Sequence, residues 1–83
     1  MDDKLKEKIK ELTLMLLYLN SWEEDGPYEK SKRAWKGFDF DVLNLLSDEG
    51  LIYDGKRSKS ITFSEQGIIK AKELLEKYGV NAE

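Results

Sequence analysis

Residues 38–53 read FDFDVLNLLSDEGLIY and carry the boundary signals of a short helix. Asp39 is suited to cap this helix, because a carboxylate just before the first turn accepts a hydrogen bond from a free backbone N–H group. A phenylalanine before the cap and a leucine four residues after it form the apolar pair that often accompanies a helix start. Gly50 is suited to the left-handed residue that ends a helix. The stretch therefore predicts a helix over about 39–49.

Residues 60–80 read SITFSEQGIIKAKELLEKYGV and repeat these signals in the same order. Ser64 is the cap and Gly79 is the stop, so the pattern predicts a helix over about 64–78. Gly67 stands in the first turn of that helix, where glycine lowers helix propensity. A glycine in such a position indicates a close approach of another backbone segment.

Two runs rich in β-branched and aromatic residues lie between these helices, and a charged turn joins them. Short runs of this kind on either side of an Asp-Gly pair predict a β-hairpin, here over 51–63. Apolar periodicity at the N-terminus predicts a further helix over about 3–20. The expected fold is therefore α+β and mainly helical, with three main helices and a short β-hairpin between the last two.

The predicted N-terminal helix has an apolar stripe whose members recur at steps of three and four: Leu5, Ile9, Leu12, Leu16 and Leu19. In the second half of this helix nearly every face is apolar. A helix that is apolar all round is enclosed either by its own domain or by a partner. Because the chain is small, we expect a surface for self-association, formed by Leu12, Met15, Leu16 and Leu19.

Residues 21–37 carry few periodic hydrophobic residues and include the single proline of the chain. They predict a long connection with one helical turn near 29–34. The charge of this segment changes sign, from three acids at 23–25 to four bases further on. Trp35 has two interpretations. It anchors the connection onto the core, which we favour, or it belongs with the bases to a surface on which unpaired nucleotides stack.

The chain has 83 residues, of which 40% are hydrophobic and 37% are charged, and its formal net charge is −3. This composition predicts one domain over 1–83 with a single core. The absence of cysteine and histidine removes thiolate nucleophiles, disulfides and the commonest metal ligand. No nucleophile or phosphate-loop motif occurs either. We therefore expect no enzyme activity, no cofactor, no metal and no small-molecule ligand.

No apolar run approaches the roughly 20 residues that a membrane-spanning helix needs. The N-terminus also lacks the apolar segment of a signal peptide. The lack of cysteine fits a reducing compartment, where disulfides are rare. We expect a cytoplasmic protein that does not contact membranes.

The stretch from Asp41 to Ile52, together with ITFSEQG at 61–67, resembles the end of winged helix-turn-helix domains over roughly residues 40–78. The resemblance implies that helix 39–49 enters the major groove of DNA and that the hairpin is a wing. That helix carries four acids and no base, which opposes contact with phosphates. We therefore expect a small winged-helix-like binding domain whose contacts with DNA or RNA are made by bases elsewhere in the chain.

The nucleic-acid hypothesis assigns phosphate contacts to bases on the hairpin and in the connection before it: Lys56, Arg57, Lys59, Lys30, Lys32, Arg33 and Lys36. If both groups lie on one side of the molecule, they form a single basic face. The alternative for the hairpin bases is a solvated turn that keeps strand edges from pairing with other chains. The alternative function is a protein-interaction module, homodimeric through the first helix, with no nucleic-acid binding.

A second resemblance covers most of the chain. LLYL at 16–19, RAWKGFDFDVL at 33–43 and the C-terminal half are similar to a family of small uncharacterised prokaryotic proteins with a domain of unknown function. This resemblance implies no activity.

Overall fold

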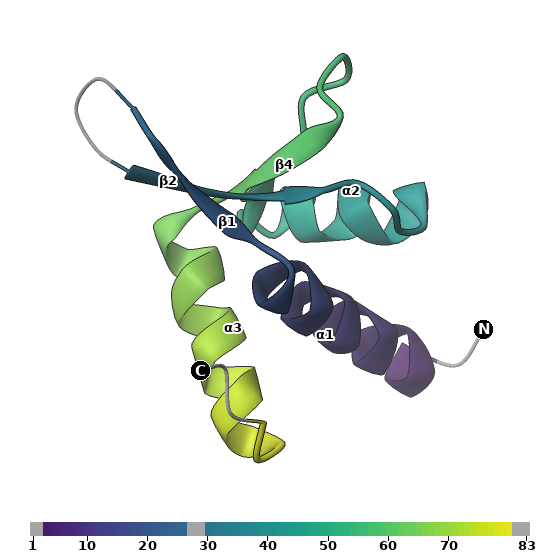
Figure 1. The fold of residues 1–83 in the computed structure, drawn as a ribbon. Coiled ribbons are helices and arrows are strands. Elements are labelled where there is room, and N and C mark those ends of the chain that lie inside the picture. The colour runs from purple at the N-terminus through teal and green to yellow at the C-terminus, as the bar shows by residue number, and fades with distance from the viewer. Residues whose placement is uncertain (1–2, 27–29, 81–83) are drawn as a thin grey trace.

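The computed structural model describes residues 3–26 and 30–80, which form three helices and one antiparallel sheet (Figure 1). In chain order the elements are α1 (Asp3–Leu19), β1 (Trp22–Asp25), β2 (Lys30–Trp35), α2 (Phe40–Asp48), β3 (Ile52–Tyr53), β4 (Ser60–Phe63) and α3 (Glu65–Lys77). The strands lie side by side in the order β1-β2-β4-β3. All three helices cover one face of the sheet, because Ile52, Ile61 and Phe63 are buried in one cluster with leucines of every helix. The predicted fold class, α+β and mainly helical, is confirmed.

Both predicted helix caps are present. The carboxylate of Asp39 accepts a hydrogen bond of 3.0 Å from a backbone N–H two residues on, and Ser64 Oγ accepts one of 2.9 Å from a backbone N–H three residues on. Gly50 and Gly79 have φ angles of 76° and 69°, a conformation that glycine adopts without steric cost. Helices α2 and α3 therefore begin and end within a residue or two of where the cap and stop signals place them.

Residues 21–37 are not the long connection that the sequence predicts. The prediction of a helical turn near 29–34 is also wrong, because residues 30–34 belong to strand β2. Position 29 lies outside the described residues. β1 and β2 form a hairpin, and β2 also pairs with β4, so the sheet has four strands instead of two. The register places Glu23 opposite Lys32. Opposite charges on facing residues stabilise a strand pair, so the change of charge sign is itself the signal of this hairpin.

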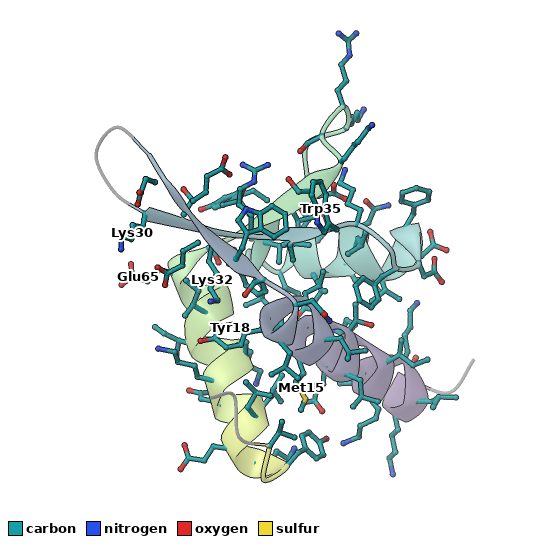
Figure 2. All side chains as sticks on the ribbon, viewed as in Figure 1. Met15, Tyr18, Lys30, Lys32, Trp35 and Glu65 are labelled. Atoms are coloured by element: carbon teal, nitrogen blue, oxygen red, sulfur yellow. The ribbon has the colours of Figure 1, made fainter. Side chains whose placement is uncertain are left out.

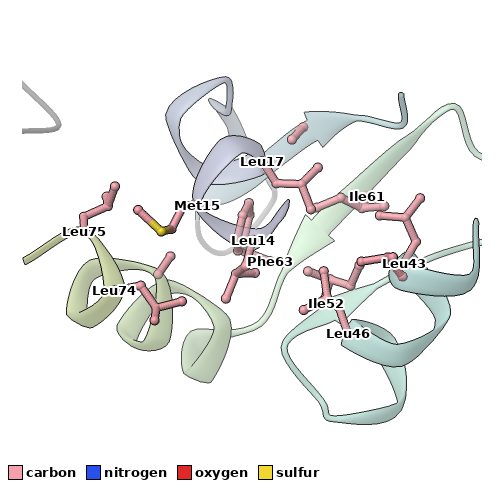
Figure 3. Packing of buried hydrophobic residues seen from close by; sticks show 13 residues of the cluster. Leu14, Met15, Leu17, Leu43, Leu46, Ile52, Ile61, Phe63, Leu74 and Leu75 are labelled. Carbon is pink, nitrogen blue, oxygen red and sulfur yellow. The ribbon is translucent and has the colours of Figure 1, made fainter. Parts of the chain in front are cut away.

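Helix α1 contributes to the core with a different face from the one that its apolar stripe predicts. Leu14, Met15 and Leu17 are buried, with exposed fractions of 1%, 5% and 1%. Figure 3 shows Met15 directed toward α3. The prediction that Met15 contributes to an exposed interaction surface is therefore wrong. Of the stripe itself, only Ile9 packs against the core.

The lysine-rich first half of α1 is tied to the other helices by polar side chains. The ammonium of Lys10 contacts the carboxylate of Glu49 at the end of α2. The hydrogen bond that Lys10 donates to Glu49 raises the pKa of Lys10 above its ordinary value, although burial alone would lower that pKa. Lys8 contacts the hydroxyl of Tyr78 at the end of α3, and that hydroxyl donates a hydrogen bond of 3.1 Å to Glu11. These contacts orient α1 so that four leucines of its apolar stripe face away from the domain: Leu5, Leu12, Leu16 and Leu19.

Replacing Tyr78 by phenylalanine is expected to raise the pKa of the Glu11 carboxyl toward its ordinary value. Partial burial alone would raise this pKa, but the hydrogen bond from Tyr78 and the charges of Lys77 and Lys8 outweigh burial and lower it. A carboxyl with a lowered pKa contributes stability above its unfolded-state pKa, about 4.3 for glutamate, and loses it as the pH falls through the folded-state pKa. NMR titration of the Glu11 carboxyl carbon measures the change. Tyr53→Phe is the control, and an unchanged titration in Tyr78→Phe would contradict the assignment.

Gly67 lies against the backbone of Leu51, which confirms the close approach that the sequence indicates. A Cβ atom at Gly67 would stand 1.8 Å from the carbonyl oxygen of Leu51 and 2.8 Å from its carbonyl carbon. These atoms belong to the segment that joins α2 to β3. Because they are backbone atoms, no side-chain rotation can make room for a methyl group.

Gly67→Ala is expected to destabilise the protein by about 3 kcal/mol or more, because the methyl group forces α3 away from the segment before β3. That is a large part of the stability of a small domain, about 5–15 kcal/mol. Gly37→Ala is the matched control, since no atom lies within 4 Å of a Cβ atom there. Urea denaturation measures both variants, and equal midpoints would refute the close contact.

Candidate functional site

The loop at 54–59 between β3 and β4, called the wing below, carries three exposed bases: Lys56, Arg57 and Lys59. Their side chains form no ion pair or hydrogen bond with the part of the chain that the structure describes. The wing bases are therefore available to an external anion.

The bases of β2 are engaged with the protein itself. Lys30 lies 3.9 Å and Arg33 Nε lies 3.3 Å from glutamates of β1. The ammonium of Lys32 lies 4.6 Å from the centre of the Tyr18 ring, within the range of a cation–π interaction, and Figure 2 shows the two side chains together. Each of the three bases of β2 thus has a partner among the described residues.

The seven predicted contact bases do not form one basic face. Lys30 and Lys32 line a groove beside α3, whereas the wing projects near the other end of β2 (Figures 1 and 2). Arg33 reaches toward the wing, since its Nη2 lies 3.3 Å from Ser58 Oγ. Only the wing remains as a group of uncompensated positive charges among the seven.

Lys36, the residue after β2, holds the wing onto the sheet. Its ammonium contacts the Asp54 carboxylate and donates a hydrogen bond of 2.7 Å to the carbonyl oxygen of Gly55. The side chain of Lys36 is only 15% exposed and that of Asp54 only 11%. Asp54 Oδ1 is buried and accepts no hydrogen bond from the described residues, so its contact with Lys36 acts as an ion pair. Lys36 therefore supports the wing rather than presenting its charge to phosphates.

Helix α2 has an acidic exposed face, formed by Asp41, Asn44 and Asp48. In a helix-turn-helix domain another helix comes shortly before the reading helix. Here strand β2 precedes α2, and residues 3–26 and 30–80 contain no such helix pair. The structure does not confirm the winged-helix resemblance.

Helix α1 exposes four leucines to solvent, and together they are called the leucine stripe below. Their exposed fractions are 52% for Leu5, 45% for Leu12, 47% for Leu16 and 43% for Leu19. Three of the four residues predicted for a self-association surface are therefore accessible, and Leu5 extends that surface toward the start of the helix. Single exposed leucines are ordinary, but a row along one helix indicates an interaction surface.

The sheet face turned away from the helices, called the open face below, carries aromatic residues, among them Trp35, for which the sequence left two interpretations. Alternate residues of a strand point to opposite faces. The register therefore aligns one residue of each strand in a row across the open face: Trp22, Arg33, Thr62 and Tyr53. Trp35 is 63% exposed, and its ring centroid lies 4.8 Å from that of Trp22. The prediction that Trp35 anchors the chain in the core is wrong.

A groove of about 460 Å³ runs between the first half of α1 and α2, with Ile9, Val42 and Leu45 among its lining residues.

Within residues 3–26 and 30–80, no three acidic side chains gather closely enough to hold a metal ion. None of the three described helices is both long and apolar enough to cross a membrane.

Lys36→Met is expected to lower the free energy of unfolding by about 1–3 kcal/mol, because it leaves the buried Asp54 carboxylate without its compensating charge. Lys30→Met is the matched control. It breaks an ion pair between two well-exposed side chains, so its effect should stay within about 0.5 kcal/mol. Urea denaturation gives both values, and amide hydrogen exchange at 55–59 reports loosening of the wing. Equal stability of the two variants would contradict the role of Lys36.

Residues 5–81 match a family described as a domain of unknown function, DUF6429. The chain is 34% identical over 70 residues to an uncharacterised protein, y4hR, of Sinorhizobium fredii, and this match covers 83% of the chain and 85% of that protein. No solved structure matches the chain. These two similarities extend over nearly all of the described fold, and they confirm the resemblance to small uncharacterised prokaryotic proteins. The chain belongs to the DUF6429 family, whose function is not known.

Proposed function

We propose that this protein is a protein-interaction domain that pairs with a second copy of itself through α1. The observation that carries the proposal is the exposed leucine stripe. With Ile9, the leucines follow one another along the helix at steps of four, three, four and three: Leu5, Ile9, Leu12, Leu16 and Leu19. This alternation is the spacing of the contact seam between two packed helices.

The rest of α1 explains why this seam is free. Leu14 and Leu17, on the other side of the helix, are each 1% exposed and belong to the domain core. The helix therefore has two apolar faces, and its own domain covers one of them. A second copy is the natural occupant of the other, because the same stripe on two chains can meet across a two-fold axis.

Charge favours an antiparallel arrangement of the two α1 helices. The first half of α1 exposes lysines, among them Lys6 and Lys8, whereas the second half is nearly all apolar. A parallel pair would bring the lysine-rich halves of both copies together. An antiparallel pair keeps them apart and also opposes the two helix dipoles favourably.

The size of the surface predicts a weak dimer. Burying half of a leucine side chain contributes about 1 kcal/mol, so eight half-exposed leucines across the two-fold axis contribute about 8 kcal/mol. Loss of rotational and translational freedom costs about 4–15 kcal/mol. The difference between these opposing terms is at most about 4 kcal/mol in favour of the dimer, so the dimer should form only at concentrations approaching millimolar.

Leu16→Glu is expected to raise the dissociation constant of the dimer by about tenfold or more, because it removes two buried leucines and places two like charges in the interface. Sedimentation velocity at several protein concentrations measures this change. Ile69→Glu is the matched control: Ile69 is 52% exposed, but it lies on α3 outside the leucine stripe. Wild-type protein that remains monomeric up to about 1 mM, the limit of a very weak interface, would contradict the proposal.

A second candidate function is nucleic-acid binding through the wing. It is supported by three exposed bases without internal partners, Lys56, Arg57 and Lys59. The net charge of −3 and the acidic face of α2 weigh against a large phosphate-binding surface. The contact would therefore be local and strongly dependent on salt.

A further inference from the structure

The open face of the sheet is a solvent-exposed aromatic surface with no helix over it. Trp35 is 63% exposed and Tyr53 is 65% exposed. Aromatic residues of this size usually bury most of their surface, so two that stay exposed on one face indicate a place for a ligand. Figure 2 shows Trp35 on β2, apart from the core residue Met15 on α1.

The register of the strands places the aromatic residues of the open face at defined points along the sheet. Trp22 packs beside Trp35 with an angle of 42° between the ring planes. Trp22 and Tyr53 stand in the same row on the two outer strands, three strand spacings apart, which corresponds to about 14 Å. The Trp22–Trp35 pair and Tyr53 therefore offer two separate positions for flat groups.

Arg33 lies between these two positions and is held by several contacts. Its guanidinium donates hydrogen bonds to Ser60 Oγ, at 2.6 Å from Nη2 and 3.1 Å from Nε. Nε also lies 3.3 Å from a Glu24 carboxylate oxygen. Arg33 of the row and Glu24 beside it thus place one positive and one negative charge close together, which leaves the centre of the open face nearly neutral.

Positive charge without an internal partner adjoins this face at the wing. Trp35 is paired in register with Ser60, the residue that follows Lys59. The Lys36–Asp54 ion pair holds the base of the wing against the end of β2. The exposed ring of Trp35 and the three wing bases therefore lie at the same end of the sheet.

We propose that the open face binds single-stranded nucleic acid, with unpaired bases stacked on Trp35 and Tyr53 and phosphates held by the wing. Exposed aromatic rings beside a small group of cations are the combination by which proteins bind single strands without sequence preference. A duplex fits less well, because its bases are already stacked on one another. This inference rests on the second candidate function above and adds the binding surface and the class of ligand.

The test uses the full chain and two unlabelled ligands at low salt, a single-stranded oligothymidylate and a DNA duplex of the same length. Tryptophan fluorescence and backbone amide NMR shifts follow each titration. Trp35→Ala and Tyr53→Ala are each expected to weaken single-strand binding about tenfold, the effect of losing one stacked base. Phe40→Ala is the matched control, because Phe40 is 71% exposed but lies at the start of α2, away from the open face. Trp35→Phe, which keeps a ring, should retain most of the affinity.

The wing is tested separately by replacing Lys56, Arg57 and Lys59 together with glutamine. This variant is expected to reduce the slope of log affinity against log salt by about 2, since three phosphate contacts on a single strand are lost. If the wing variant loses binding while Trp35→Ala and Tyr53→Ala bind like wild type, the wing binds nucleic acid but the proposed use of the open face is wrong.

Three further results would overturn the proposal. The duplex could bind as tightly as the single strand, or Phe40→Ala could weaken binding as much as Trp35→Ala does. Absence of any shift with either ligand at low salt would remove the wing function as well. Sedimentation of the same samples reports dimerisation through α1 independently, so failure of that proposal is distinguishable from failure of this one.

Discussion

The antiparallel pairing of β2 with β4 is the interaction on which the rest of the structure depends. It places Ala34 opposite Ile61 and joins the N-terminal part of the chain to the C-terminal part in one sheet. Both side chains are almost fully buried, at 1% and 0% exposed. Without this pairing, β4 would have only the two-residue β3 as a partner, and an isolated two-stranded hairpin is marginally stable in water. The same pairing provides the face on which α1, α2 and α3 share one core.

The register of that pairing also decides the character of the open face. Since side chains alternate along a strand, the inward position of Ala34 requires that Arg33 and Trp35 point outward. A shift of one residue would bury the ring of Trp35 and expose the neighbouring small side chain. The aromatic surface is therefore a direct consequence of how β2 meets β4, and of the hydrogen bonds by which Arg33 and Ser60 occupy the space beside Trp35.

Helix α1 and the wing illustrate two ways in which charge and apolar surface are distributed in a small domain. In α1, Lys10 and Lys8 reach Glu49 and Tyr78 of the other helices, while the leucine stripe remains outside. In β2, Lys30 and Arg33 pair with acids of β1, so part of a segment that is strongly basic in sequence is neutralised in space. Of the seven bases predicted to contact phosphates, only those of the wing lack a partner among the described residues. The surfaces open to partners are thus the ones that local pairing does not use.

The sequence by itself determined the elements whose signals are local. Asp39 and Ser64 as caps, Gly50 and Gly79 as stops and Gly67 as a close approach act through a few neighbouring atoms, and each is found in the structure. The four-stranded sheet, the burial of Met15 and the exposure of Trp35 were decided only by tertiary structure. Each depends on contacts between residues far apart in the chain, such as β2 with β4 and α1 with α3. In α1 both sides are apolar, so periodicity alone could not distinguish the side that packs in the core from the side that stays exposed.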